Sequence, residues 1–144
     1  MRGTQGFSLL EVLFVVTILG ILLALGVPSY QRWITRTELD RAAGLVATEI
    51  QTTRSAARKG TVQTFTATAG GTSVVSRGTT LNLPTAKTDG AVSLTFQPPF
   101  GTIQTPAGAV APITPVNVIV RSTRDPNLFR TVSVVSLMGK VIVK

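Results

Sequence analysis

Residues 6–19 read GFSLLEVLFVVTIL, and they begin the most apolar part of the chain. It opens an apolar run from Phe7 to Val27 in which Glu11 is the only charged residue. As an α-helix that rises ~1.5 Å per residue, a run of this length extends about 31 Å. That length is close to the ~30 Å thickness of the hydrocarbon core of a bilayer. The run therefore predicts a membrane-spanning helix.

Glu11 is the unusual residue of this run, because a carboxylate inside a bilayer costs roughly 2.5–3.5 kcal/mol on insertion scales. No Lys or Arg lies three or four residues away, so no base on the same helix face can neutralise it. Gly6 stands before the run, whereas an ordinary secretory signal has its small-residue cleavage site after it. Cleavage after Gly6 would give Phe7 a charged amine that can pair with Glu11 of the same or a neighbouring chain. We interpret Glu11 as an assembly residue; the alternative is a plain membrane anchor that tolerates a carboxylate near the interface.

The composition excludes several kinds of active site. The chain has 144 residues, enough for one modest domain, and contains no Cys and no His. Thiol nucleophiles, disulfides, zinc fingers and triads with a His base are therefore excluded. Six acidic residues remain, and none pairs with another at a spacing that suggests a catalytic site. We expect no enzyme activity, cofactor or metal, and keep an enzyme tethered to the membrane only as an alternative.

Beyond the apolar run the pattern remains helical. Pro28 cannot donate a helical hydrogen bond and should kink the helix; the alternative is that it ends the membrane helix. From Tyr30 to Lys59 there is no proline, and apolar residues recur every three or four positions, which is typical of a half-buried helix. The buried stripe should be Leu39, Ala42, Ala43, Val46, Ile50, Thr53 and Ala57. The other face should carry Arg36, Glu38, Arg41, Thr48, Arg54, Arg58 and Lys59.

After Gly60 the composition changes to Thr, Val, Gly, Pro and Ser, with alternating β-branched runs between turn signals. The runs predict five to seven mostly antiparallel strands packed on the helix stripe. They are Val62–Thr68, Thr72–Ser76, Thr79–Leu83, Val92–Gln97, Val116–Ser122, Arg130–Ser136 and Lys140–Lys144. Thr102–Pro115 is rich in Pro, Gly and Ala, and we interpret it as an extended loop. The predicted fold class is α+β: a long N-terminal helix, half membrane-spanning and half amphipathic, packed on a C-terminal antiparallel β-sheet.

Gly6, Phe7 and Glu11, followed by the apolar run and Pro28, resemble the class III signal of type IV pilins and type II secretion pseudopilins. The resemblance implies that a prepilin peptidase cuts between Gly6 and Phe7 and N-methylates Phe7. It implies that Glu11 helps the subunit to dock into a growing filament, and that Pro28 marks the bent part of the helix.

The same resemblance implies a division of the chain. Residues 1–6 are a leader, 7–29 a transmembrane and assembly helix, and 30–144 a pilin-like domain, with a helix at 30–59 and a β-sheet at 61–144. The implied partners are the prepilin peptidase, other pilin or pseudopilin subunits and inner-membrane lipid. The implied location is the inner membrane, as a single-pass protein, before assembly. Afterwards it is the periplasm and a cell-surface filament.

A second resemblance lies in residues 94–101, which read LTFQPPFG. They resemble the Phe-x-Pro-x-Gly strand and turn of GspH/FimT-type minor pseudopilins, with one extra residue before Gly101. Residues 132–144 resemble the closing hairpin of that family. The implied function is that of a minor pilin or pseudopilin that supports filament assembly, protein secretion or DNA uptake. In the turn, Gly101 permits positive φ, and Phe96 and Phe100 can cover an edge of the core.

The net charge of +8 favours anionic partners without choosing among them. Some members of this family bind DNA through a C-terminal Gly-Arg-x-Arg motif, where the present chain reads Gly139-Lys140-Val141-Ile142 and keeps one base. The candidate DNA contacts are Arg121, Arg124, Arg130, Lys140 and Lys144. A DNA receptor in natural transformation is therefore the alternative function, and a solvated basic surface without a DNA role is the simpler interpretation.

Overall fold

The computed structural model describes residues 8–104, 115–136 and 139–144. Gly6 and Phe7, the predicted cleavage site, lie outside the described residues, as does most of the predicted loop 102–115. The chain divides into two compact units, Met1–Ile34 and Thr35–Lys144.

One helix, α1, runs from Leu9 to Ala57 and contains Pro28 in its interior. The helix therefore continues past Pro28, and the alternative in which Pro28 ends it is wrong. The kink itself stays a prediction. The helix ends two residues before the predicted Lys59, and Gly60 follows with φ of 112°, a backbone conformation that only glycine adopts readily.

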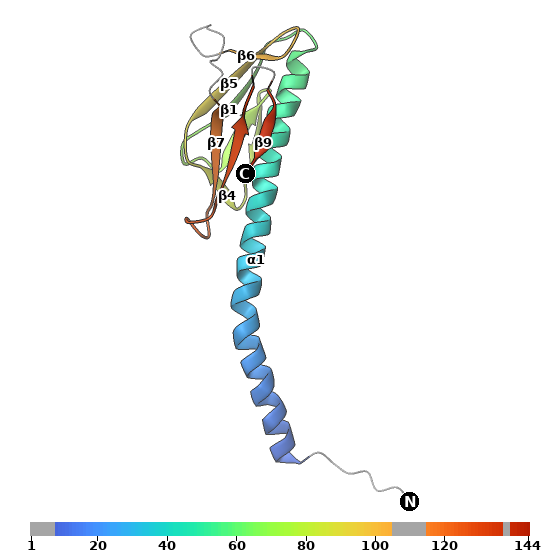
Figure 1. Ribbon diagram of the computed structural model, residues 1–144, viewed down its shortest axis with the longest axis vertical. Helices are drawn as coiled ribbons and strands as arrows, with labels where there is room; N and C mark the ends of the chain where they lie inside the picture. The colour runs from blue at the N-terminus through green and yellow to red at the C-terminus, as the bar shows by residue number, and fades with distance from the viewer. Residues whose placement is uncertain (1–7, 105–114, 137–138) are drawn as a thin grey trace, which may run out of the picture. The chain divides into compact units, whose positions relative to one another are not determined.

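The part of α1 in the second unit buries one face against the strands (Figure 1). Residues three and four apart share a helix face, so the predicted stripe faces the core along its whole length. All seven predicted positions are buried, together with Ala47. On the opposite face Arg36, Arg41, Thr48, Arg58 and Lys59 are exposed as predicted. The prediction is wrong for Glu38 and Arg54, which are only partly exposed and bury their Oε2 and Nε atoms, respectively.

The strands form two antiparallel sheets. The five-stranded sheet has the order β3-β2-β1-β5-β6, and the four-stranded sheet has the order β4-β7-β8-β9. In chain order the strands are β1 (Gln63–Ala67), β2 (Ser73–Ser76), β3 (Thr79–Asn82), β4 (Ala86–Thr88), β5 (Val92–Gln97), β6 (Thr102–Gln104), β7 (Val116–Ser122), β8 (Phe129–Val134) and β9 (Val141–Val143).

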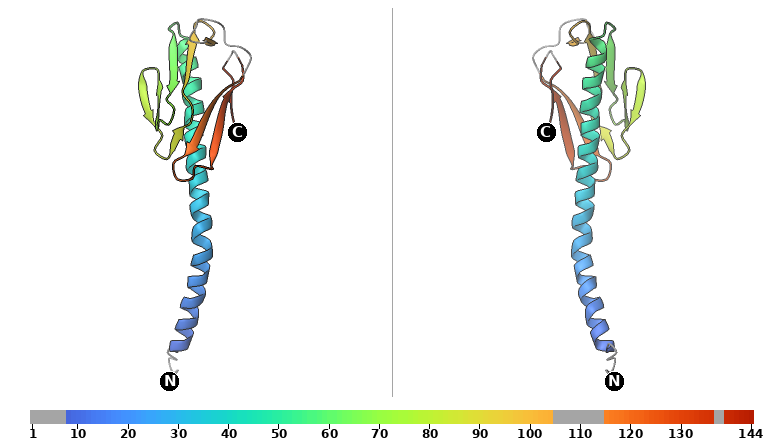
Figure 2. Two further views of the ribbon diagram at one scale, coloured as in Figure 1. Left: turned by 90° about the vertical axis from the view of Figure 1, so that its left-hand side faces the viewer. Right: turned by 90° about the vertical axis from the view of Figure 1, so that its right-hand side faces the viewer.

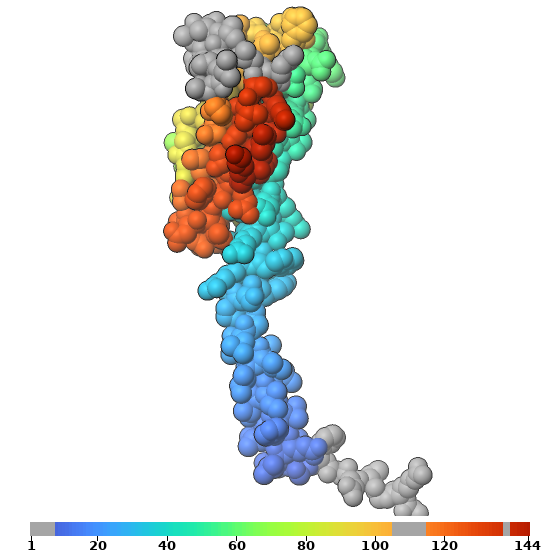
Figure 3. Space-filling model, in the orientation of Figure 1, coloured from blue at the N-terminus to red at the C-terminus, as the bar shows by residue number. Residues whose placement is uncertain are grey.

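Both sheets pack on the same helix. Figure 2 shows β1–β3 and β7–β9 on opposite sides of the C-terminal half of α1, and the space-filling view shows β7–β9 directly against it (Figure 3). Phe65 of β1 lies opposite Leu94 of β5, and Val118 of β7 lies opposite Val132 of β8. All four side chains are buried, as is Ile50 of α1, so the helix stripe and the two inner sheet faces form one hydrophobic core.

The α+β prediction is confirmed, with two corrections to its β part. The seven predicted runs all form strands, but β4 and β6 were missed, so the described residues contain nine strands instead of five to seven. Each missed strand is three residues long, too short to show alternation. Because β6 is Thr102–Gln104, the prediction of an extended loop that begins at Thr102 is wrong for these three residues. The strands also divide between two sheets, whereas the sequence predicts one.

Two turns close against Arg54. Gly101 and Gly139 have φ of 66° and 68°, and both lie beside the Arg54 side chain. Phe96, which precedes the first turn, is fully buried, but Phe100 within it is 67% exposed, so its predicted role at the core edge is wrong. The Arg54 side chain therefore lies against Gly101 and Gly139 and is only partly exposed to solvent.

Candidate functional site

Glu11 lies in the first turn of α1 and takes part in the cap of that helix. The Oγ atom of Ser8 accepts a hydrogen bond from the backbone N–H of Glu11 at 3.2 Å. The Ser8 carbonyl oxygen accepts hydrogen bonds from the N–H groups of Glu11 and Val12. Ser-x-x-Glu is the spacing of a capping box. The sequence prediction missed this role, although the serine three residues before Glu11 was a visible signal.

The cap gives Glu11 a favourable environment within its own helix. A carboxylate in the first turn is stabilised by the positive end of the helix dipole, typically by 0.3–1 kcal/mol. This is smaller than the roughly 2.5–3.5 kcal/mol that a carboxylate costs at the centre of a bilayer, so the dipole alone would not offset the burial of Glu11 deep in the membrane. Phe7, whose amine is the predicted partner, lies outside the described residues, and the Phe7–Glu11 pair stays a prediction.

The apolar part of α1 is bare along its whole length. Its most apolar window has a mean hydropathy of 2.7, and none of that window is buried. Leu9 and Leu25 are 84% and 73% exposed. The hydroxyl of Thr17 donates to the Leu13 carbonyl oxygen at 2.8 Å, so its polar group is satisfied inside the helix. By length and composition α1 can cross a membrane.

Three of the five candidate DNA contacts are ion-paired. Arg121 binds Asp89, with Nε 2.9 and 2.7 Å from the two carboxylate oxygens, and it also donates to the Pro126 carbonyl oxygen. Nε of Arg130 lies 2.6 Å from Asp40 of α1, and Nη1 of Arg124 lies 3.5 Å from Glu38. These arginines tie β7, β8 and the connection between them to other parts of the domain.

Lys140 and Lys144 differ from the three arginines. Both side chains are exposed, and neither makes an ion pair with any residue that the structure describes. Lys140 lies just before β9 and Lys144 just after it. Of the five predicted DNA contacts, only Lys140 and Lys144 thus carry a positive charge that no acidic side chain among the described residues neutralises.

The Arg121–Asp89 pair predicts a specific pH dependence of stability. Hydrogen bonds from Arg121 favour the ionised form and lower the pKa of Asp89 below its ordinary value of 3.8. A carboxyl whose pKa is lower in the folded than in the unfolded chain stabilises the fold at neutral pH. That contribution is lost as the pH falls through the lowered pKa. We expect Asp89→Asn to lower the urea midpoint of the detergent-solubilised chain at pH 7, and the difference from wild type to shrink at about pH 2.

Arg121→Gln checks that this effect belongs to the pair. Its urea midpoint should also approach that of the wild type as the pH falls, because the partner charge that lowers the pKa of Asp89 is gone. A difference between wild type and Asp89→Asn that is the same at both pH values would contradict the assignment.

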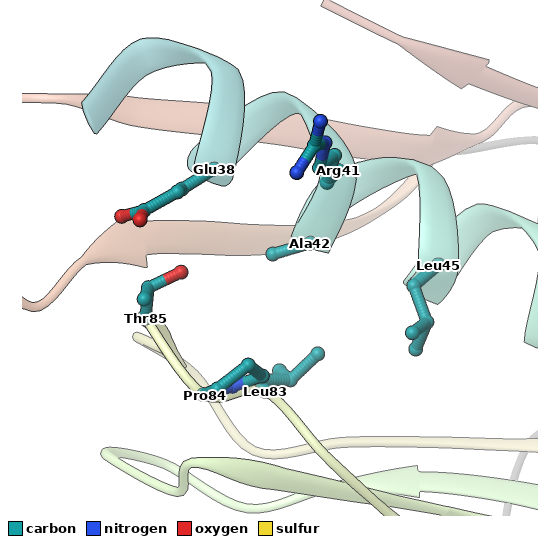
Figure 4. Close-up of a pocket in the computed structure, with 7 residues that line it drawn as sticks. All are labelled: Glu38, Arg41, Ala42, Leu45, Leu83, Pro84 and Thr85. Carbon is teal, nitrogen blue, oxygen red and sulfur yellow. The ribbon is translucent and has the colours of Figure 1, made fainter. Parts of the chain in front are cut away.

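A small hollow lies between α1 and the segment before β4 (Figure 4). Its volume is about 290 Å³, and its lining residues are Glu38, Arg41, Ala42, Leu45, Leu83, Pro84 and Thr85. The Glu38 carboxylate lies toward Thr85, whereas the Arg41 side chain points away from Leu83 and Pro84 (Figure 4). The volume is at the lower limit for small-molecule sites. Within the described ranges no group of three or more His, Cys, Asp or Glu could hold a metal ion.

Comparison with known proteins points to the N-terminal part of the chain. Residues 1–27 match the family model described as the prokaryotic N-terminal methylation motif. A fimbrial protein of Pseudomonas aeruginosa is 43% identical over 47 residues, which cover 33% of this chain and 30% of that protein. The type IV major alpha-pilin of Moraxella bovis is 38% identical over 47 residues, with the same coverage. The type IV major fimbrial protein FimA of Dichelobacter nodosus is 41% identical over 51 residues, 33% of each chain.

The match spans only about a third of the length of these relatives. No solved structure matches the chain at a comparable level. The methylation motif coincides with the bare apolar part of α1 and includes Glu11, and the remainder of the helix packs on antiparallel sheets. The chain therefore carries the N-terminal methylation motif in residues 1–27, and over its N-terminal third it is similar to fimbrial proteins and to a type IV pilin.

Proposed function

We propose that this chain is a structural subunit of a type IV pilus or of a related secretion pseudopilus. A prepilin peptidase cleaves it between Gly6 and Phe7 and methylates the new terminus. The apolar part of α1 then holds the subunit in the inner membrane until other subunits take the place of lipid around it. The proposal assigns no catalytic role to the chain itself.

The observation that carries this proposal is the methylation motif over residues 1–27, placed on a helix that buries none of its apolar window. A bare apolar helix needs a partner, either lipid or other subunits, because exposed apolar surface is costly in water. The second unit complements this arrangement, because it has a core of its own and needs no covering by the apolar part of α1.

The finer assignment to a minor subunit is part of the proposal. It is supported by the turn at residues 97–101, in which Gly101 has positive φ and follows the buried Phe96. The relatives whose names give a class of subunit are a major pilin and major fimbrial proteins, and they match only the N-terminal third of the chain, so they do not support the minor assignment. We do not put DNA binding first, because three of its five candidate contacts already pair with acidic side chains.

The proposal is tested by coexpression of the full chain with a prepilin peptidase. We expect intact-mass analysis to show loss of residues 1–6 and gain of one methyl group, with Phe7 as the new N-terminus. A chain whose mass is unchanged and that still begins at Met1 would remove the basis of the proposal.

Gly6→Leu is the control for the cleavage position. A site that accepts glycine before the cut has little room for a branched side chain, so we expect this variant to keep residues 1–6. It should still enter the membrane, because the apolar run is unchanged. Cleavage of Gly6→Leu at the same rate as the wild type would argue that the cut lies elsewhere.

A further inference from the structure

An exposed aromatic pair marks the end of the apolar surface of α1. The rings of Tyr30 and Trp33 stack with centroids 6.0 Å apart and an angle of 25° between their planes. Their side chains are 62% and 60% exposed. Residues three apart lie on the same helix face, so the two rings form one patch. A patch of large, solvent-exposed aromatic side chains is typical of a surface that binds a membrane or another protein.

The position of this patch along the helix indicates what covers it. From Val12 to Gln31 the chain contains no charged residue, and Glu11 and Arg32 flank this segment. At ~1.5 Å per residue the segment extends about 30 Å, the thickness of a hydrocarbon core. Tyr30, Arg32 and Trp33 then lie at the level of the lipid headgroups.

The chemistry of these three side chains fits that level. Tyr and Trp combine an apolar ring with a hydrogen-bonding group, and both are enriched where membrane meets water. Arg32 follows Tyr30 and precedes Trp33, and a long basic side chain can extend along the helix to reach a phosphate group. Another protein helix would cover the rings equally well, but it would not require a cation at the boundary of the charge-free segment.

We propose that Tyr30, Arg32 and Trp33 form an interfacial anchor that binds phospholipid headgroups and fixes the depth of α1 in the bilayer. This inference rests on the membrane-inserted stage of the proposed function, and it is independent of cleavage and methylation. The anchor holds the unassembled subunit at one level, with Glu11 at the opposite boundary of the hydrocarbon.

Trp33 is the only tryptophan of the chain and reports its own depth. The full chain is reconstituted in phosphatidylcholine–phosphatidylglycerol vesicles that carry a spin label at the headgroup, in the upper acyl chain or at the bilayer centre. We expect Trp33 fluorescence to be quenched more by the two shallow labels than by the central one. Strongest quenching by the central label would overturn the proposal.

Substitutions in the anchor test whether these side chains, and not the membrane helix alone, set the depth of Trp33. Tyr30→Ala combined with Arg32→Gln should bring the ratio of shallow to central quenching toward one, whereas Arg41→Gln, farther along α1, should leave it unchanged. An unchanged quenching ratio in the double variant would overturn the anchor. The anchor would also be overturned if neither iodide nor any of the spin labels quenched Trp33 fluorescence, because another copy of the chain would then cover this side chain.

Flotation with the vesicles separates the two proposals. A chain that floats but shows the wrong Trp33 depth contradicts the anchor alone. A chain that does not float contradicts both the anchor and the membrane-inserted stage of the proposed function.

Discussion

Glu11→Gln is expected to leave the chain cleaved, inserted and folded, and to reduce its incorporation into filaments on the order of a hundredfold or more. The reason is that glutamine keeps the shape of the side chain, and the hydrogen bond to Ser8 Oγ survives because the backbone N–H of residue 11 donates it. Only the charge is lost. Removal of one partner from a buried ion pair typically costs 3–5 kcal/mol, because the other charge stays buried, and ~1.4 kcal/mol is a factor of ten.

This substitution separates the two roles of Glu11 that the structure and the sequence suggest. If the carboxylate served only to stabilise the first turn of its own helix, both Glu11→Gln and Glu11→Ala would assemble nearly like the wild type, because the backbone N–H of residue 11 makes the Ser8 hydrogen bond. If the carboxylate pairs with the amine of Phe7, both variants fail at the same step. The measurement is the fraction of cleaved subunit that sediments with sheared filaments, relative to the fraction left in the membrane.

Thr17→Ala is the matched control. Thr17 is a polar residue of the same apolar run, and its hydroxyl is already bonded to the Leu13 carbonyl oxygen of its own helix. Its loss removes a polar group without removing a charge, so incorporation should be near that of the wild type. A comparable defect in Thr17→Ala would show that assembly responds to any change in this helix, and the specific role of Glu11 would be lost.

The sequence was sufficient for features that depend on periodicity. The helix stripe from Leu39 to Ala57 was predicted position by position, because a spacing of three and four residues defines a face whatever packs against it. The strands β5 and β7 were predicted to the residue, since their β-branched runs are bounded by clear turn signals. Strands of three residues, such as β4 and β6, contain too few positions to show alternation.

Features that depend on tertiary partners could not be predicted. Arg121, Arg124 and Arg130 looked like one basic rim, but Asp89, Glu38 and Asp40 come from distant parts of the chain and neutralise them. Arg54 follows the pattern of a solvent-facing residue, and only the fold shows that two turns enclose it. The cap by Ser8 is different, because its spacing was available in the sequence and was overlooked.

Gly101→Ala is expected to destabilise the domain by about 2–5 kcal/mol, the largest effect that we expect for the removal of a single glycine. A Cβ atom at this position would lie 2.8 Å from Cγ of Arg54 and 3.1 Å from the Arg54 carbonyl oxygen. The Arg54 stem also lies close to the Gly139 backbone, because a Cβ built there would be 2.8 Å from its Cδ atom, so it has little room to shift in that direction. Overpacking of this kind costs roughly 1–3 kcal/mol, and positive φ at a residue with a Cβ adds about 1–2 kcal/mol.

Gly78→Ala isolates the backbone part of this cost. Gly78 has φ of 76°, similar to 66° at Gly101, but a Cβ there would meet no atom within 4 Å. We expect about 1–2 kcal/mol for Gly78→Ala in urea unfolding of the detergent-solubilised chain, followed by circular dichroism. Equal losses for the two variants would mean that Arg54 yields freely and that its enclosure has no energetic consequence.

A double-mutant cycle with Arg54→Ala identifies the side chain that Gly101 accommodates. Alanine at position 54 removes Cγ, the nearest atom, but leaves the backbone carbonyl in place. The Gly101→Ala loss should therefore become smaller in the Arg54→Ala background without disappearing, with a coupling of roughly 0.5–3 kcal/mol between the two positions. Additive losses would show that the strain comes from φ, the Arg54 carbonyl oxygen and Cγ of Arg58, which would lie 3.2 Å from the new Cβ atom. In that case the glycine would be required by the turn and these neighbours and not by the Arg54 side chain.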